Sequence, residues 1–233
     1  MAVLCRALGL LFVLNPATGS TAIARLLVER FDGAWLPAQD GPVVPRKHST
    51  LGELLAAGLL SPDERSRLCV ATTVRNPYDR LVSIHAKRRG IPDEQLARPD
   101  FYMNRQYGGE RADEVRWIRD HDFPAWIRRR FIRNWALRTL LGRPPSVYDR
   151  YVEGVDVVMR YERLQQDFDA LIRRLGANPV PIPRVNVSRE RIRRDYREEY
   201  DRLSRLLVGI GQRRDLERFD YGFDAEGPDP RRG

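Results

Sequence analysis

The apolar run LGLLFVL at residues 8–14 leads into the turn-rich loop NPATGST at residues 15–21. Apolar residues then recur at helical spacing, at Ala22, Ile23, Leu26, Leu27 and Phe31. A nearly continuous apolar run is typical of a parallel strand that is covered on both faces. We therefore predict a buried parallel strand over 8–14, followed by the loop and a helix.

The same N-terminal stretch allows one alternative. Arg6 followed by the apolar residues 7–14 has two features of a secretory signal peptide. The run is short, however, and no small-x-small cleavage pattern follows it cleanly. Strand, loop and helix remain the simpler interpretation.

Strands and helices alternate along the rest of the chain. The sequence predicts strands over 68–74 and 155–160, a helix that starts at Asn76-Pro77, and an amphipathic helix over 164–175. A long last helix is predicted with Ile192, Tyr196, Tyr200, Leu203, Leu207 and Ile210 turned inward. We predict one α/β domain over residues 1–224, a mainly parallel central sheet flanked by helices, and a disordered tail over 225–233.

The charge of the chain points to an anionic partner. There are 41 Lys+Arg and 32 Asp+Glu, a difference of +9, and Lys47 and Lys87 are the only lysines. This excess fits a nucleic acid, a phosphorylated cofactor, a sulfated glycan or a membrane surface. No apolar run reaches the roughly 20 residues that a membrane-spanning helix needs. The two cysteines, Cys5 and Cys69, show no metal-binding spacing, so no metal site is predicted.

The loop at 15–21 is the first candidate site. A helix N-terminus offers backbone N–H groups and a positive dipole end to an anion. Thr18, Ser20 and Thr21 add hydroxyl groups, and Gly19 permits close approach of the backbone. The loop lacks the lysine of a Walker A motif. A capped strand-to-helix turn without a ligand is the alternative interpretation.

Arg75 and Ser83 form the second candidate site. Arg75 follows a predicted strand, at the end where open α/β sheets bind ligands, and Ser83 lies two turns into the next helix. The guanidinium and the hydroxyl are predicted to converge on one phosphate. The alternative is an Arg–Asp pair in a helix cap, with Ser83 as a small packing residue.

Taken together, these segments resemble the sulfotransferase family. Residues 16–21 resemble its 5′-phosphosulfate loop, usually Pro-Lys-Thr-Gly-(Ser/Gly)-Thr, and residues 74–83 resemble its 3′-phosphate motif. The segment RKHST at 46–50 is similar to one found in carbohydrate-type and bacterial members. Later segments also match the family pattern: 161–168, 186–188 and 215–223. The resemblance spans residues 12–223.

The resemblance implies a P-loop-NTPase-like sulfotransferase fold and transfer of a sulfuryl group from 3′-phosphoadenosine 5′-phosphosulfate (PAPS). The acceptor would be a hydroxyl or amine of a carbohydrate or small molecule, the product adenosine 3′,5′-bisphosphate, and no metal would be needed. The implied nucleotide-binding residues are Ala17, Thr18, Gly19, Ser20, Thr21, Arg75, Ser83 and Arg189. His48 is the candidate base for the acceptor proton, and His85 and His121 are rivals by residue type alone.

One position departs from the family pattern. The loop lysine, which would neutralise charge at the bridging oxygen, is replaced by Ala17. Losing such a positioned charge typically lowers the rate by about 10²- to 10³-fold. Lys47 is the candidate replacement. The alternative is a catalytically weak or inactive protein that binds PAPS or adenosine bisphosphate.

Other classes fit the sequence less well. A P-loop kinase is disfavoured because the sequence lacks the Walker lysine. The sequence also shows no nucleic-acid recognition motif, so no nucleic-acid partner is predicted. The arginines of 128–138 and 189–194 are expected to form solvated faces, with some near the site selecting an anionic acceptor. We predict a cytoplasmic enzyme without a membrane span. The sequence carries no signal for its oligomeric state.

Overall fold

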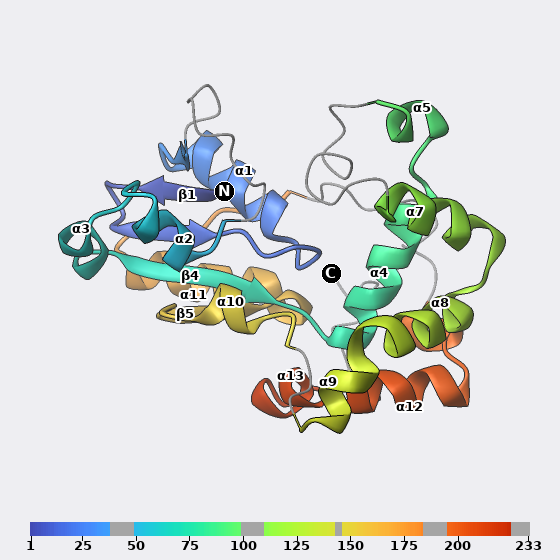
Figure 1. Cartoon of the computed structure of the whole chain (residues 1–233). Helices are drawn as coiled ribbons and strands as arrows, with labels where there is room; N and C mark the ends of the chain where they lie inside the picture. Colours follow the sequence, from blue (N-terminus) through green and yellow to red (C-terminus); the bar gives the residue numbers. More distant parts are fainter. Residues whose placement is uncertain (38–48, 99–109, 143–145, 184–194, 225–233) are drawn as a thin grey trace. The chain divides into compact units, whose positions relative to one another are not determined.

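The structure is a computed structural model of the 233-residue chain, and it describes residues 1–37, 49–98, 110–142, 146–183 and 195–224. The described residues form two compact units (Figure 1). The first unit holds those within 1–75 and 147–187, and the second holds those within 76–146 and 188–225. The tail predicted over 225–233 lies outside the described residues.

The first unit contains a five-stranded mixed sheet in the order β3-β1-β2-β4-β5. Its strands are β1 (Ala2–Cys5), β2 (Leu10–Val13), β3 (Ala34–Leu36), β4 (Cys69–Val74) and β5 (Val157–Arg160). β2, β4 and β5 are parallel, as predicted, whereas β1 is antiparallel to both β2 and β3. The α/β class is confirmed. The prediction of a mainly parallel sheet is wrong at this edge, because half of the strand pairings are antiparallel.

The antiparallel edge begins with a hairpin that the sequence did not predict. A tight turn joins β1 to β2, in which the Gly9 N–H donates to the Arg6 carbonyl at 3.0 Å and Gly9 adopts a φ of 58°. β2 lies between β1 and β4, and all four of its side chains are buried. The residues considered as a signal peptide therefore include the central strand of the sheet.

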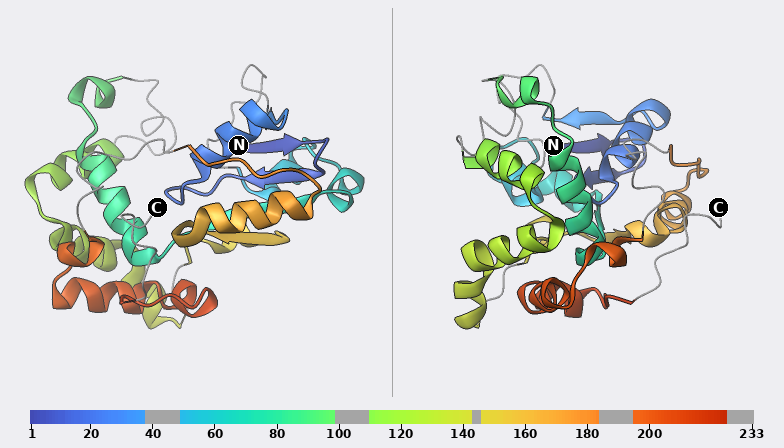
Figure 2. Two further views of the ribbon diagram at one scale, coloured as in Figure 1. Left: turned by 180° about the vertical axis from the view of Figure 1, so that it is seen from behind. Right: turned by 90° about the vertical axis from the view of Figure 1, so that its right-hand side faces the viewer.

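Helices cover both faces of this sheet, which explains the continuous apolarity of β2. α1 (Ser20–Arg30) and α11 (Leu164–Arg174) share a core with Leu10 and Phe12. On the other face, α2 (Leu51–Ala56) and α10 (Asp149–Val152) share a core with Leu11 and Val13. Figure 2 (left) shows α11 running along the sheet. The short helices α3 (Pro62–Ser66) and η2 (Tyr161–Arg163) precede β4 and α11.

The second unit is helical. Its described elements are α4 (Pro77–Arg89), α5 (Asp93–Leu96), α7 (Glu110–Asp120), α8 (Phe123–Arg130), the π-helical turn η1 (Phe131–Trp135), α9 (Ala136–Leu140), the 3₁₀ turn η4 (Tyr196–Glu199), α12 (Arg202–Gly211) and α13 (Arg213–Arg218). Their shared core is rich in aromatic residues, including Tyr78, Phe123, Trp126 and Trp135. The helix start predicted at Asn76-Pro77 is confirmed, because the Asn76 side chain accepts the Tyr78 N–H.

The prediction of one long last helix is wrong in two respects. Within the described part, Tyr200 is extended and Asp201 starts a new helix by exchanging hydrogen bonds with Ser204. Leu203 and Ile210, predicted to point inward, are 47% and 39% exposed. Ser204, Val208 and Gly211 face the core instead. A β-carbon on Gly211 would lie 2.4 Å from Trp135, so only a residue without one allows this close approach.

His85 gives this unit a pH-dependent stability. It lies between Phe123 and Trp126, and burial, reinforced by Arg89 and Arg88 and opposed by Asp122, lowers its pKa to about 4. The unfolded chain binds this proton at a pKa near 6.5. Above pH ~6.5, His85 therefore contributes on the order of 3 kcal/mol to the free energy of unfolding. This contribution is lost as the pH falls toward 4.

We expect His85→Phe, which keeps an aromatic ring in the same pocket, to remove this part of the pH dependence. The measurement is the free energy of unfolding in urea, for both proteins, at several pH values between about 4 and 6.5. Parallel loss of stability in the two proteins would show that His85 does not carry it.

Candidate functional site

The candidate loop lies at a switch point of the first unit's sheet. β2 and β4 lie next to each other in the sheet, and the chain leaves them in opposite directions. After β2 it passes through α1 to β3, which lies beyond β1, whereas after β4 its next strand is β5, on the far side of β4. Because β2 and β4 are parallel, their carboxyl ends lie at the same end of the sheet. Open α/β sheets bind ligands where the chain diverges in this way. Residues 15–21 follow β2 at this end of the sheet, and Arg75 follows β4 there.

Hydrogen bonds inside the loop fix its shape. The hydroxyls of Thr18 and Ser20 both donate to the Asn15 carbonyl, at 2.8 and 2.7 Å. The Asn15 side-chain amide donates to the Thr73 carbonyl at 2.9 Å, and the Thr73 and Thr18 hydroxyl oxygens lie 2.5 Å apart. The hydroxyl protons of Thr18 and Ser20 are therefore used within the loop. Their donation to a bound anion stays a prediction, since it would require these internal hydrogen bonds to break.

The backbone of the loop is a second candidate source of anion donors. Ala17 and Gly19 both adopt positive φ angles, 62° and 77°, on either side of Thr18. Such turns direct successive N–H groups toward one side, which forms an anion-binding concavity. α1 starts at Ser20 without a side-chain cap and has no acidic residue in its first turn. A left-handed conformation costs about 1 kcal/mol for a residue with a β-carbon, so the loop's contacts must hold Ala17 in place.

Arg75 lies against this loop. Its Nη1 donates to the Ala17 carbonyl at 3.4 Å, and its guanidinium carbon lies 3.9 Å from the ring centre of Tyr161. The buried Tyr148 hydroxyl donates to the Arg75 carbonyl and accepts its N–H at 3.3 Å. The backbone is held independently of the side chain, and the guanidinium charge is placed beside the position where the family has its lysine.

Tyr161 connects the predicted segments. A β-carbon on Gly19 would lie 2.9 Å from Cδ2 of Tyr161, so the ring closely approaches the loop while its face carries Arg75. Three segments that the family resemblance singled out, at 16–21, Arg75 and 161–168, thus lie together in the first unit. Tyr148, Tyr161 and the buried Asn15 were not predicted as site residues. Only a tyrosine at a strand end, for Tyr161, was a signal visible in the sequence.

The other predicted site residues are placed as follows. Thr21 is the second residue of α1, beside the loop, and is half-buried. Ser83 is half-buried in α4 of the second unit, so its pairing with Arg75 on one phosphate stays a prediction. Lys47, His48 and Arg189 lie outside the described residues. Of the rival bases, His85 is buried with a lowered pKa, and His121, directly after α7, stacks on Trp117 of that helix.

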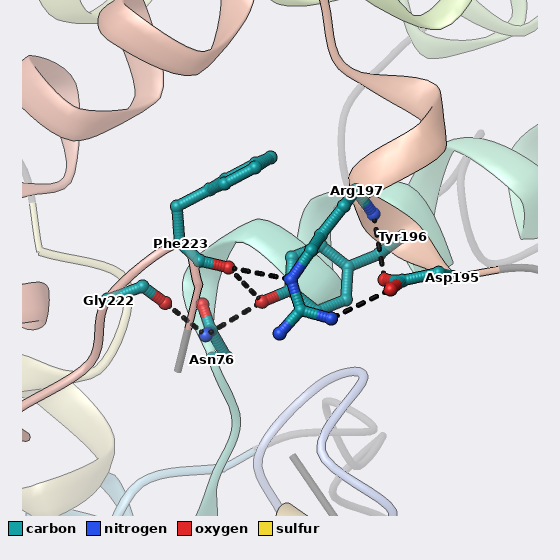
Figure 3. Close-up of polar contacts among 6 residues, drawn as sticks. All are labelled: Asn76, Asp195, Tyr196, Arg197, Gly222 and Phe223. Atoms are coloured by element: carbon teal, nitrogen blue, oxygen red, sulfur yellow. Dashed lines mark hydrogen bonds and ion pairs between the residues drawn. The ribbon is translucent and has the colours of Figure 1, made fainter. Parts of the chain in front are cut away.

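Asn76, next to Arg75 in the predicted phosphate motif, has a structural role in the second unit (Figure 3). Its side-chain amide donates to the Gly222 carbonyl at 2.8 Å and lies 3.4 Å from the Tyr196 hydroxyl. The Tyr196 hydroxyl in turn donates to the Phe223 carbonyl at 2.5 Å, and Arg197 pairs with Asp195 at 2.7 Å. This network joins the start of α4 to residues 215–223, another segment of the family resemblance.

Comparisons with known proteins identify no relative. No protein-family model, no curated protein and no solved structure matches the chain. Within the described residues, no helix combines the length and apolarity needed to cross a membrane. The same residues contain no group of three or more His, Cys, Asp and Glu side chains arranged to hold a metal ion.

Proposed function

We propose that the first unit binds the 5′-phosphosulfate end of PAPS at residues 17–21 and that the protein transfers the sulfuryl group to an acceptor hydroxyl or amine. The observation that carries the proposal is the uncapped N-terminus of α1 at the sheet's switch point, with Arg75 beside it. Backbone N–H groups, a helix dipole and a guanidinium all favour the same doubly anionic group. The proposal thus assigns Arg75 to the 5′ end of the nucleotide, whereas the sequence motif assigned it to the 3′-phosphate. The P-loop-like sulfotransferase fold belongs to this proposal.

Sulfuryl transfer breaks the bond between sulfur and the oxygen that bridges it to the 5′-phosphate, forms a bond to the acceptor and releases the acceptor proton. The 5′-phosphate gains negative charge as that bond breaks. The N–H groups at the start of α1 would stabilise this charge without reorganising. Arg75, held by Tyr161 and Tyr148, would add a fixed positive charge. His48 is the proposed base for the proton, with Lys47 as a second cation.

The acceptor proposed is a carbohydrate or small molecule. An anionic acceptor would make use of the chain's arginine excess. A location in the cytoplasm is part of the same proposal.

Ala17 favours a second candidate function, nucleotide binding without efficient transfer. Family members carry a lysine at this loop position, and the structure puts a neutral, half-buried methyl group there. Such a protein would bind adenosine 3′,5′-bisphosphate through the same loop. The two functions differ only in turnover.

The test combines binding with turnover. Thermal unfolding is followed with adenosine 3′,5′-bisphosphate, with ATP and with adenosine, and transfer of ³⁵S from labelled PAPS is followed on a panel of sugars, uronic-acid glycans, phenols and amines. We expect selective stabilisation by the bisphosphate and label transfer to at least one acceptor class. Stabilisation without transfer would support the second candidate. No stabilisation by the bisphosphate would overturn both.

A further inference from the structure

The second unit exposes two apolar stripes on helices that pack against each other. α12 packs against η1 and α9, and Figure 1 shows α9 beside α12. Large apolar side chains point outward from both segments: Ile132, Leu137, Leu140, Leu141, Leu203, Leu206 and Ile210. We call these seven residues the apolar face. Leu140 is the most prominent of them, with 83% of its surface exposed.

Both segments already have another side packed in the core. On α12, Ser204, Val208 and Gly211 face inward, and the exposed Leu203, Leu206 and Ile210 recur three and four residues apart on a different side. In the other segment, Trp135 is buried while the leucines of 137–141 are not. The apolar face is therefore an additional surface of a helix pair whose fold does not need it. Each segment thus presents exposed apolar residues three or four positions apart, and contiguous exposed apolar surface marks interaction sites.

The two segments that carry the apolar face are basic, although acidic residues adjoin them and pair with arginines. Residues 131–141 contain two arginines, residues 202–214 contain four, and neither segment contains Asp or Glu. Arg205 and Arg213 form ion pairs with Asp224 and Glu217. Arg133, Arg138 and Arg202 are exposed and have no ion pair among the residues that the structure describes.

We propose that the apolar face docks on an anionic phospholipid bilayer, lying in its interface without spanning it. Leucine and isoleucine side chains flanked by arginines suit the boundary between acyl chains and anionic headgroups. A second copy of this chain would bring arginines of the same sign together, which disfavours self-association. Side chains as exposed as Leu140 would need a matching groove on a protein partner, whereas a bilayer accepts them anywhere. This inference is independent of the proposed sulfotransferase activity.

Co-sedimentation with vesicles tests the inference on the full chain. We expect binding to vesicles of phosphatidylcholine with phosphatidylserine to exceed binding to phosphatidylcholine alone by at least about 10-fold at low salt. The triple variant Leu137→Gln, Leu140→Gln, Leu141→Gln should bind anionic vesicles about 30-fold or more weakly. Because its substitutions lie at exposed positions, we expect this variant to fold, and circular dichroism and thermal unfolding are the checks.

A matched pair of charge variants separates the apolar face from net charge. Arg133→Gln with Arg138→Gln should weaken binding to anionic vesicles about 25-fold, roughly fivefold for each arginine. Arg25→Gln with Arg30→Gln removes two exposed charges from α1 in the first unit and should change binding less than twofold. Equal losses in the two variants would overturn the inference. So would absence of vesicle binding, or a dimer that the triple leucine variant dissociates.

Discussion

Arg75→Ala is expected to weaken binding of adenosine 3′,5′-bisphosphate by about 10- to 100-fold, because a hydrogen bond to a charged group is worth about 1.5–3 kcal/mol. The guanidinium lies 3.4 Å from the Ala17 carbonyl and over the Tyr161 ring, so its charge faces the loop that would hold the nucleotide. Tyr148 holds only the backbone of residue 75, and that clamp survives the substitution. Isothermal titration of the bisphosphate gives the affinity.

Two control variants make this result specific. Arg163→Ala removes a more exposed arginine of the same unit, paired with Asp167, and should leave the affinity within twofold. Arg75→Lys keeps the charge without the planar fork and should recover part of the loss. If folded Arg75→Ala binds the bisphosphate as well as the wild type does, the assignment of Arg75 to a nucleotide anion is wrong.

Ala17→Lys is expected to raise the rate of sulfuryl transfer on the order of 100-fold, because it restores a positive charge where the family places one. The backbone at residue 17 already tolerates a β-carbon at a φ of 62°, so lysine adds no new strain there. Residue 17 is half-buried. The neighbouring guanidinium of Arg75 repels a second cation, which limits the gain.

The informative comparison is with Ala17→Gln, which adds a polar side chain to the loop without charge. Single-turnover transfer from labelled PAPS is measured for the three proteins at matched saturation. A rise with lysine alone supports sulfuryl transfer in which Ala17 is the weak point. Equal and substantial transfer rates in the three proteins would show that another cation already stabilises the charge that develops at the bridging oxygen. No transfer by any of the three, with bisphosphate binding intact, would leave nucleotide binding as the function.

Elements whose local pattern agrees with their surroundings were predictable. Leu10–Val13 and Cys69–Val74 are continuously apolar or β-branched because helices cover both faces of the central strands. Asn76-Pro77 starts a helix by local capping, which depends only on neighbours in the chain. β3 was missed because three residues, Ala34–Leu36, carry too little pattern, and their strand state depends on pairing with β1.

The candidate site was partly predictable for similar reasons. A loop between a strand and a helix places Gly19 and the start of α1 by local geometry, so its position could be inferred from residues 8–31. The inward turn of the Thr18 and Ser20 hydroxyls could not, because their acceptor geometry depends on how the loop folds back on Asn15. Nor could the contact of Tyr161 with Arg75, which joins residues from two separate strand ends.

The sequence by itself determined the α/β class, the central strands, the start of α4 and the loop at 15–21, since each depends on short-range periodicity and capping. The tertiary structure alone decided that the sheet has an antiparallel edge and that Arg75 lies on the loop beside Ala17. It also decided which side of α12 is buried. Leucines predict an inward face, but the close approach of Gly211 to Trp135 turns the small residues inward and leaves Leu203, Leu206 and Ile210 outside. Such choices depend on steric fit between distant segments, which no local pattern encodes.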